Sequence, residues 1–324
     1  MSRTRVTLAD VAAASGVSVT TASLVLTGRA RELRISEAAE QRVRSTAHLL
    51  GYRRGGPPAR PRARTIGLVL EPGAPDVVRG VAEAASWRGF SLLVMGSGGE
   101  PVNGVVHVAG TRTTTAPRGL RPGPVVLLNS TAAAVPSVVP DEVRGGRAAA
   151  RVLVEAGHRH VHLVGAGPGR FDVPPDGITA LERLIGLRDV FDAAGVAVSG
   201  SRCPEWTPEA GYDATRALVR HCRPTALVCL DDRLAFGAQQ ALTEAGLSTP
   251  RDVSVLGFGD DPAASWMRPQ LTTVAVSRHE LGARAVAVLT SLLDTHVLPA
   301  PLVHRVPPRV RLRASVAPPN RCGG

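Results

Sequence analysis

The chain has 324 residues, 44% of them hydrophobic, and a formal net charge of +11. This length allows more than one buried core, and we recognise neither an apolar run long enough to span a membrane nor an N-terminal secretory signal. The four cysteines lack the paired spacing of a zinc site or a disulfide framework, so we expect free thiols, no cofactor or metal, and a cytoplasmic location.

The positive charge is concentrated near the N-terminus. Residues 1–64 contain twelve arginines and only four acidic residues, so this segment holds eight of the eleven net charges. Such a surplus attracts polyanions. We therefore expect nucleic acid to be the partner of the N-terminal part of the chain.

Two short helices are predicted within that basic segment. Thr7 and the acid three residues later form a capping-box pattern, which favours a helix over 8–15. Gly16 permits a tight turn, and Ser18 can cap a second helix over 19–26. Two helices joined by a glycine turn predict a helix-turn-helix.

A third helix and a linker follow. Ser36 can cap the helix, which is expected to end at Gly51. The stretch 53–64, RRGGPPARPRAR, has no apolar periodicity, and each of its prolines lacks an amide donor. We predict a DNA-binding headpiece at 1–52, an extended linker at 53–64 and a larger core at 65–318.

The core alternates apolar runs with amphipathic segments. This alternation predicts an α/β fold in which helices cover parallel sheets. The expected strands are 65–70, 91–95, 105–109, 125–128, 161–164, 225–230 and 253–257, and the expected helices are 76–88, 145–156, 179–194, 233–245 and 279–294.

Several blocks of sequence resemble, in order, the lactose-repressor (LacI) family. They are VTLADVAAASGVSVTTASLVLTG (6–28), RISEAAEQRVRSTAHLLGY (34–52), EAGHRHVHLVG (155–165), ALERLIGLRDVFDAAG (180–195), ALVCLDDRLAFGAQQALTEAG (226–246), DVSVLGFGDD (252–261), PQLTTVAVSRHELG (269–282) and VRLRAS (310–315). The resemblance implies a helix-turn-helix headpiece and a periplasmic-sugar-binding-protein-like core of two subdomains. We expect the N-subdomain at about 65–157 and 277–298, and the C-subdomain at about 158–276 and 299–318.

By this resemblance the second helix lies in the major groove of DNA. Val19 and Thr20 match the family's base-reading pair, and Leu24 occupies a third reading position, where apolar contact with thymine methyl groups is expected. Hydroxyls or helix-terminal amides suited to phosphate come from Thr7, Ser18, Thr21, Ser23 and Thr27. The alternative is that these residues are ordinary caps and packing positions.

The linker departs from the family pattern. Relatives usually form a hinge helix there that wedges a leucine into the minor groove, but this chain has GGPPARPRA with Pro61 near the wedge position. We predict no normal hinge helix and hypothesise that Arg60 and Arg62, with Arg64 as a further candidate, enter a narrow minor groove as an extended arm. The alternative is a disordered tether that only adds charge.

The ligand cleft is expected between the subdomains, at the carboxyl ends of the strands. By resemblance Arg183 matches a ligand-contacting arginine, Trp206 a stacking aromatic residue, and Asp231 a polar contact usually made by asparagine. Gly259 replaces an acid that commonly binds the effector, so Asp260 is the substitute. Further candidates for the opposing wall are Glu71 and Asp141.

A second departure concerns strands 91–96 and 105–110. Only SGGEPVNG (97–104) separates them, whereas parallel neighbours need a crossover of about a dozen residues or more. The family's usual helix is therefore expected to be missing, and because that region contributes to subunit contacts in relatives, the geometry of the dimer is open.

The sequence contains no G-x-S-x-G, Walker or H-E-x-x-H motif, and three alternating histidines, 158, 160 and 162, have no other ligands nearby in sequence. We therefore predict that the protein is not an enzyme. The expected protein is a homodimeric repressor that binds a pseudo-palindromic operator and is controlled by a small, sugar-like effector. The alternative is a DNA-binding regulator whose core only dimerises.

Overall fold

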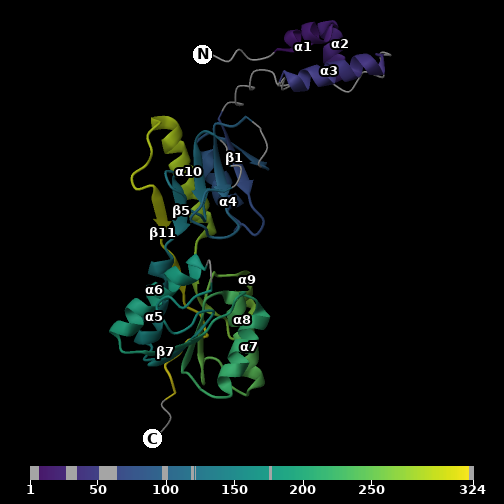
Figure 1. Cartoon of the computed structure of the whole chain (residues 1–324). Coiled ribbons are helices and arrows are strands. Elements are labelled where there is room, and N and C mark those ends of the chain that lie inside the picture. Colours follow the sequence, from purple (N-terminus) through teal and green to yellow (C-terminus); the bar gives the residue numbers. More distant parts are fainter. Residues whose placement is uncertain are drawn as a thin grey trace. The chain divides into compact units, whose positions relative to one another are not determined.

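The computed structural model describes residues 7–26, 35–50, 64–96, 101–117, 120, 122–174 and 177–320. The chain forms two compact units, Met1–Arg62 and Ala63–Gly324, which are described separately below (Figure 1). Almost all of the predicted linker lies outside the described residues, so its proposed extended conformation stays a prediction.

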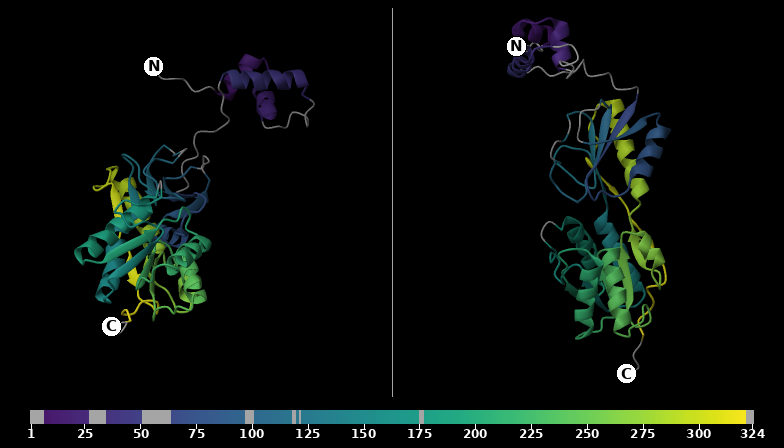
Figure 2. Two further views of the ribbon diagram at one scale, coloured as in Figure 1. Left: turned by 60° about the horizontal axis from the view of Figure 1, so that its bottom comes forward. Right: turned by 90° about the vertical axis from the view of Figure 1, so that its right-hand side faces the viewer.

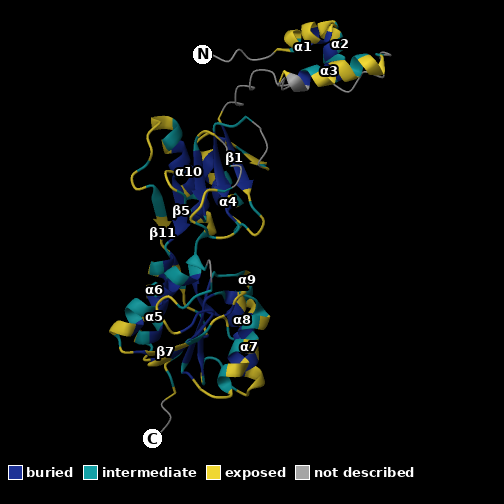
Figure 3. Ribbon diagram, viewed as in Figure 1, coloured by how far each residue is buried: buried dark blue, intermediate teal, exposed yellow. Residues whose placement is uncertain are grey.

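The N-terminal unit consists of α1 (Leu8–Ser15), α2 (Val19–Leu26) and α3 (Glu37–Leu49). The capping box at Thr7 is present, and Gly16 ends α1 with a positive φ of 66°, which favours glycine. The axes of α1 and α2 differ by 105°, within the range of a helix-turn-helix. The three helices close over a small core of Val11, Ala12, Ala22, Val25, Val43 and Ala47, while their outer faces are exposed (Figure 3).

The second unit contains two six-stranded sheets. The first is entirely parallel and has the order β11-β5-β4-β3-β1-β2. Its strands are β1 (Thr65–Leu70), β2 (Ser91–Met95), β3 (Gly104–Val108), β4 (Val125–Leu128), β5 (Ser137–Pro140) and β11 (Val303–Val306). Helices α4 (Val78–Trp87) and α10 (Arg278–Thr295) cover one face. On the other face loop residues pack against the strands, among them Val102, Leu120 and Val135.

The order of this sheet corrects one expectation about neighbours. β2 and β3 do not pair with each other, because β1 lies between them and pairs with both. The connection therefore crosses over β1, and its described residues, 96 and 101–103, contain no helix. The expectation of a missing helix stays a prediction for residues 97–100, which are not described, and β2 is an edge strand with Val94 exposed.

The second sheet has the order β12-β10-β9-β8-β6-β7, and only β12 is antiparallel. Its strands are β6 (His160–Val164), β7 (Ala197–Ser201), β8 (Ala226–Cys229), β9 (Ser254–Phe258), β10 (Thr272–Ala275) and β12 (Arg309–Arg311). One face packs on α5 (Glu142–Glu155) and α6 (Ile178–Ala193), and the other on α7 (Pro208–Val219) and α8 (Asp232–Glu244). The short α9 (Pro262–Trp266) follows β9. Figure 2 shows the two sheets from two further sides.

Two segments lie on the other side of the predicted subdomain boundaries. We expected residues up to 157 in the N-subdomain, but α5 packs on α6 and on the core of the second sheet. We expected 299–318 in the C-subdomain, but β11 pairs with β5 in the first sheet, whereas β12 and residues 313–317 bond to the second sheet as expected. The apolar face of α5 packs on the core of the second sheet, and β11 joins the first sheet by parallel backbone pairing with a strand remote in sequence.

Among the described residues no single helix is long and apolar enough to cross a membrane. Only α1 and α2 taken together meet that test by length and composition, and they are sharply bent where they meet.

Candidate functional sites

The exposed face of α2 carries the residues expected to contact DNA. Val19 is 49% exposed although it is apolar, and Thr20 beside it is also exposed. Leu24, in the next turn, is half-buried. Ala22 and Val25 face the core instead, so the helix has one packed face and one face that is at least partly exposed to solvent. An apolar side chain held at the start of a free helix face can contact the edge of a base.

Hydroxyl groups surround the start of this helix. The Ser18 Oγ accepts a hydrogen bond from the backbone N–H of Thr21 at 3.0 Å and lies 2.8 Å from the Thr21 Oγ1. The Thr7 Oγ1 caps α1 and donates to Asp10 at 2.7 Å. Capping is thus confirmed for Thr7 and Ser18, and both remain solvent-exposed. Ser23 is half-buried.

Three expected DNA contacts, Thr27, Arg60 and Arg62, lie outside the described residues. Arg64 is described and belongs to the second unit, where its guanidinium lies 4.8 Å from the centre of the Phe90 ring. A cation at this distance is attracted to the face of the ring. Arg64 therefore already has an intramolecular partner.

A cavity of about 280 Å³ lies in the second unit, where strands of both sheets end. Its wall comes from the segments that follow β1, β3, β4, β5, β8, β9 and β10 and from α5, α6 and α10. Ligand sites of parallel α/β sheets form at these carboxyl ends. The described residues that line it are Gly73, Pro75, Gly110, Asn129, Pro140, Glu142, Thr179, Arg183, Asp231, Gly259, Val276, Arg278 and Leu281.

Arg183 and Glu142 form a buried ion pair in this wall. The Nε and Nη2 groups of Arg183 donate to the two oxygens of Glu142 at 2.8 and 3.0 Å, and the Nη1 group donates to the backbone oxygen of Leu230. The guanidinium also lies 4.7 Å from the centre of the Phe258 ring and 5.6 Å from that of Trp206. Arg183 is therefore fixed in orientation before any ligand arrives.

The other expected ligand contacts divide into two groups. Asp231 lines the cavity, where one oxygen accepts from the Arg233 backbone N–H and side chain. Trp206, Glu71 and Asp141 are not among the described lining residues. Trp206 lies against Arg183, Asp141 caps α5 through the backbone N–H of Arg144, and Glu71 is bonded by His107 at 2.9 Å. The hydrogen bond from His107 lowers the pKa of Glu71.

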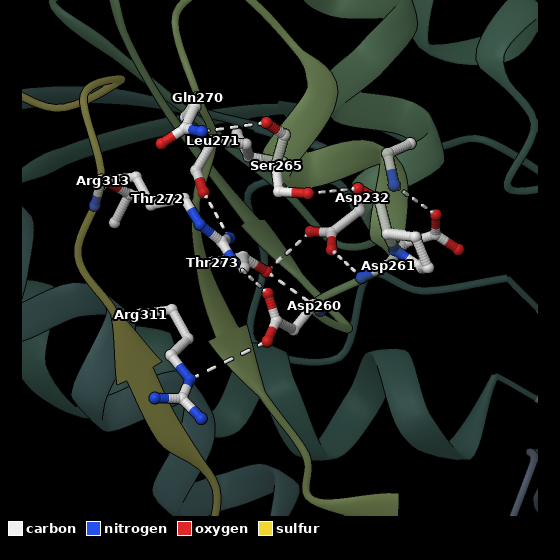
Figure 4. Close-up of polar contacts among 12 residues, drawn as sticks. Asp232, Asp260, Asp261, Ser265, Gln270, Leu271, Thr272, Thr273, Arg311 and Arg313 are labelled. Atoms are coloured by element: carbon white, nitrogen blue, oxygen red, sulfur yellow. Dashed lines mark hydrogen bonds and ion pairs between the residues drawn. The ribbon is translucent and has the colours of Figure 1, made fainter.

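Asp260, the expected substitute for the missing acid, is held by two arginines (Figure 4). Arg313 donates to its Oδ1 at 2.6 Å, and the Nε of Arg311 lies 3.8 Å from Oδ2. Asp260 is likewise not among the described residues that line the cavity, whereas Gly259 is. Gly259 has a φ of 129°, a conformation that side chains other than glycine rarely adopt. An aspartate or glutamate at position 259 would therefore require a different backbone conformation at this residue.

Asp232 is a buried acid that was not predicted as a site residue from the sequence. Its oxygens accept from the Thr273 hydroxyl at 2.7 Å and from the Asp261 backbone N–H at 2.8 Å, as Figure 4 shows. Burial raises its pKa to about 6. The carboxyl thereby joins the start of α8 to the turn after β9, and it holds that turn in place beside the cavity.

Four further polar residues of the cavity wall were not predicted from the sequence: Asn129, Glu142, Thr179 and Arg278. Asn129 follows a strand directly, which is a usable signal for a position at the carboxyl edge. Glu142 adjoins a candidate that was chosen, Asp141. Thr179 and Arg278 each lie in the first turn of a helix, and only the three-dimensional arrangement brings them to the cavity.

The three-helix unit and the two-sheet unit with a cavity define a DNA-binding transcriptional regulator that carries a ligand-binding core. A family model described as bacterial regulatory proteins, lacI family, matches residues 7–55, and one described as a periplasmic binding protein-like domain matches residues 150–316. The chain belongs to the lacI family.

Individual relatives agree with this assignment. An uncharacterised HTH-type transcriptional regulator of Streptomyces limosus is 34% identical, covering 87% of this chain and 86% of its own length. The ribose operon repressor of Escherichia coli is 28% identical, covering 87% and 92%. The solved complex of the transcriptional regulator CelR with cellobiose is similar with a TM-score of 0.61 and 26% identity, covering 96% of this chain and all of that one.

Proposed function

We propose that this regulator is a repressor whose affinity for an operator is set by a small ligand in the cavity of its core. The observation that supports the proposal best is the cavity itself, which contains a pre-oriented arginine, Arg183, at the carboxyl ends of two parallel sheets. A core that served only as a dimer scaffold would have no need of such a cavity.

In the proposed complex with DNA, α2 enters the major groove. Val19, Thr20 and Leu24 contact base edges, and the apolar members discriminate by contact with thymine methyl groups. Phosphates of the DNA are contacted by hydroxyl-bearing residues, which fix the register of the headpiece on the duplex. These residues are Thr7, Ser18, Thr21, Ser23 and Thr27. Arg60 and Arg62 are proposed to lie in the minor groove, and equal losses for specific and random DNA upon their replacement by alanine would contradict that role.

The proposed effector is a sugar or a sugar derivative. Two relatives support this class, since one is named for the ribose operon and another was solved with cellobiose. A cavity of about 280 Å³ lies near the lower end of the range of known ligand pockets, which fits a ligand of about one ring. Arg183 and Asp231 offer hydrogen bonds to ring hydroxyls.

We further propose that the protein acts as a homodimer in the cytoplasm, where its operator lies. The core exposes several large apolar side chains, including Trp266 at 72% and Trp87 at 88%. Exposed apolar residues of this size are frequent at subunit contacts. Two headpieces related by a twofold axis would bind the two halves of a pseudo-palindromic operator.

The experiment is a titration of DNA from upstream of the coding region with purified full-length protein at fixed salt, with and without a panel of sugars. The proposal expects specific binding that one ligand changes at least tenfold, equal to about 1.4 kcal/mol of coupling. Specific binding that no small molecule changes would favour a core that only dimerises. Binding that does not distinguish the operator from random DNA would contradict both functions.

A further inference from the structure

One basic residue of the cavity wall has no protein partner among the described residues. Four described lining residues are ionisable, two acidic and two basic. Glu142 is neutralised by Arg183 through two hydrogen bonds, and Asp231 is paired with Arg233, whose Nε lies 3.0 Å away. Arg278 lines the same cavity, and no described residue forms a hydrogen bond or an ion pair with it. Arg278 is exposed to solvent, and its guanidinium is therefore available to a ligand in the cavity.

The acceptors that a neutral sugar would use are mostly occupied. Both oxygens of Glu142 are bonded by Arg183. Gly259 offers no side chain, and the Asp260 carboxylate is held by Arg313 and Arg311. Because arginine is a donor only, Arg278 can bind a ligand only through acceptor atoms of that ligand. An ionised carboxylate or phosphate is the acceptor that a guanidinium binds most strongly, often through two hydrogen bonds.

We propose that the effector is an acidic, hydroxylated small molecule whose carboxylate or phosphate is bound by Arg278. This inference rests on the proposed function, because it specifies the ligand of the same cavity. The free Oδ2 of Asp231 and the hydroxyl of Thr179 remain available for the hydroxyl groups of the ligand. Sugar acids and sugar phosphates both have this chemistry.

Full-length wild type is compared with R278Q and with the matched control R284Q. Like Arg278, Arg284 is exposed and lies on α10, but it is not among the described lining residues, and its Nη2 lies 3.3 Å from the Nδ1 of His304. R284Q therefore removes the same charge outside the cavity. The melting temperature of each protein is measured while sodium phosphate or sodium acetate replaces sodium chloride at constant ionic strength. Anions that bind the folded state raise this temperature.

The proposal expects phosphate or acetate to stabilise the wild type and R284Q, and R278Q to need at least tenfold more anion for the same rise. The more effective anion identifies the acidic group as a phosphate or a carboxylate. Equal stabilisation of all three proteins, or none beyond chloride in the wild type, would overturn the proposal.

A second arm uses the matched probes glucose, gluconate and glucose 6-phosphate in the operator titration of the wild type and R278Q. An effect of glucose on operator affinity that is equal in both proteins would also overturn the acidic effector. Operator binding by the wild type without any probe keeps the two proposals separate. If that binding is specific while the anion tests fail, the regulator stands and only the acidic effector is wrong.

Discussion

The ion pair between Glu142 and Arg183 permits a quantitative test of how the cavity wall is held. Their side chains are only 4% and 8% exposed, so removing one partner leaves a charge in a poorly solvated place. Such a loss costs about 3–5 kcal/mol of folding free energy, whereas replacing both partners by apolar side chains of similar size is often close to neutral. We expect R183M to lose about 4 kcal/mol and the double variant E142L/R183M to recover most of that loss.

The assay is urea unfolding of the full-length protein, followed by tryptophan fluorescence. All three tryptophans, Trp87, Trp206 and Trp266, belong to the core unit, so the signal reports the core and not the headpiece. Trp206 lies beside Arg183 and should also change its emission in R183M. A loss below about 1 kcal/mol in R183M, or a double variant as unstable as the single one, would refute the reasoning, since it would mean that water screens the pair.

Three further outcomes follow from the structure. Burial lowers the pKa of His162 to about 4 from 6.5, so the stability contributed by the neutral ring is present above pH 6.5 and lost as the pH falls toward 4; between pH 7 and 5 the wild type should lose about 2 kcal/mol more than H162Q in urea unfolding. The pH dependence contributed by Asp232 has the opposite sign, because its pKa is raised to about 6 and the stability from its protonated form is gained as the pH falls through that value and lost as it rises. As the pH falls from 7 to 5, D232N should therefore lose about 1 kcal/mol more stability than the wild type, and an equal loss would contradict the raised pKa of Asp232. Glu182 on α6 accepts from Arg112, whose side chain is 6% exposed, and pairs with the more exposed Arg305; E182Q should cost about 3 kcal/mol and R305Q less than 1 kcal/mol, and similar losses for both variants would show that Arg112 is not the main partner.

Local features of the fold were predictable because their causes lie within a few residues. The capping box at Thr7, the turn at Gly16 and the bounds of α1, α2 and β1 follow from neighbouring side chains. By contrast, β5 and β11 were not predicted. Each has only four residues, and they are defined by pairing with each other over more than 160 residues of chain.

The same distinction applies to the cavity. Arg183 and Asp231, which lie in recognisable sequence blocks, do line the cavity, while their contact with an effector stays a prediction. Asp260 was placed there by analogy, but Arg313, 53 residues further on, holds its carboxylate. Arg278 had no local signal at all. Which polar groups stay free in a cavity depends on partners remote in sequence, and a single sequence does not give these.

The central claim is that the ligand in the core controls the affinity of the headpiece for DNA. Its most direct test is the dissociation constant of the full-length protein for its operator at fixed salt, measured with and without a saturating effector. We predict that the effector changes the dissociation constant of the wild type at least tenfold and that R183M abolishes this change. Without effector, the protein should still distinguish the operator from random DNA. An operator affinity that is specific but unaffected by every ligand bound in the cavity would contradict the claim.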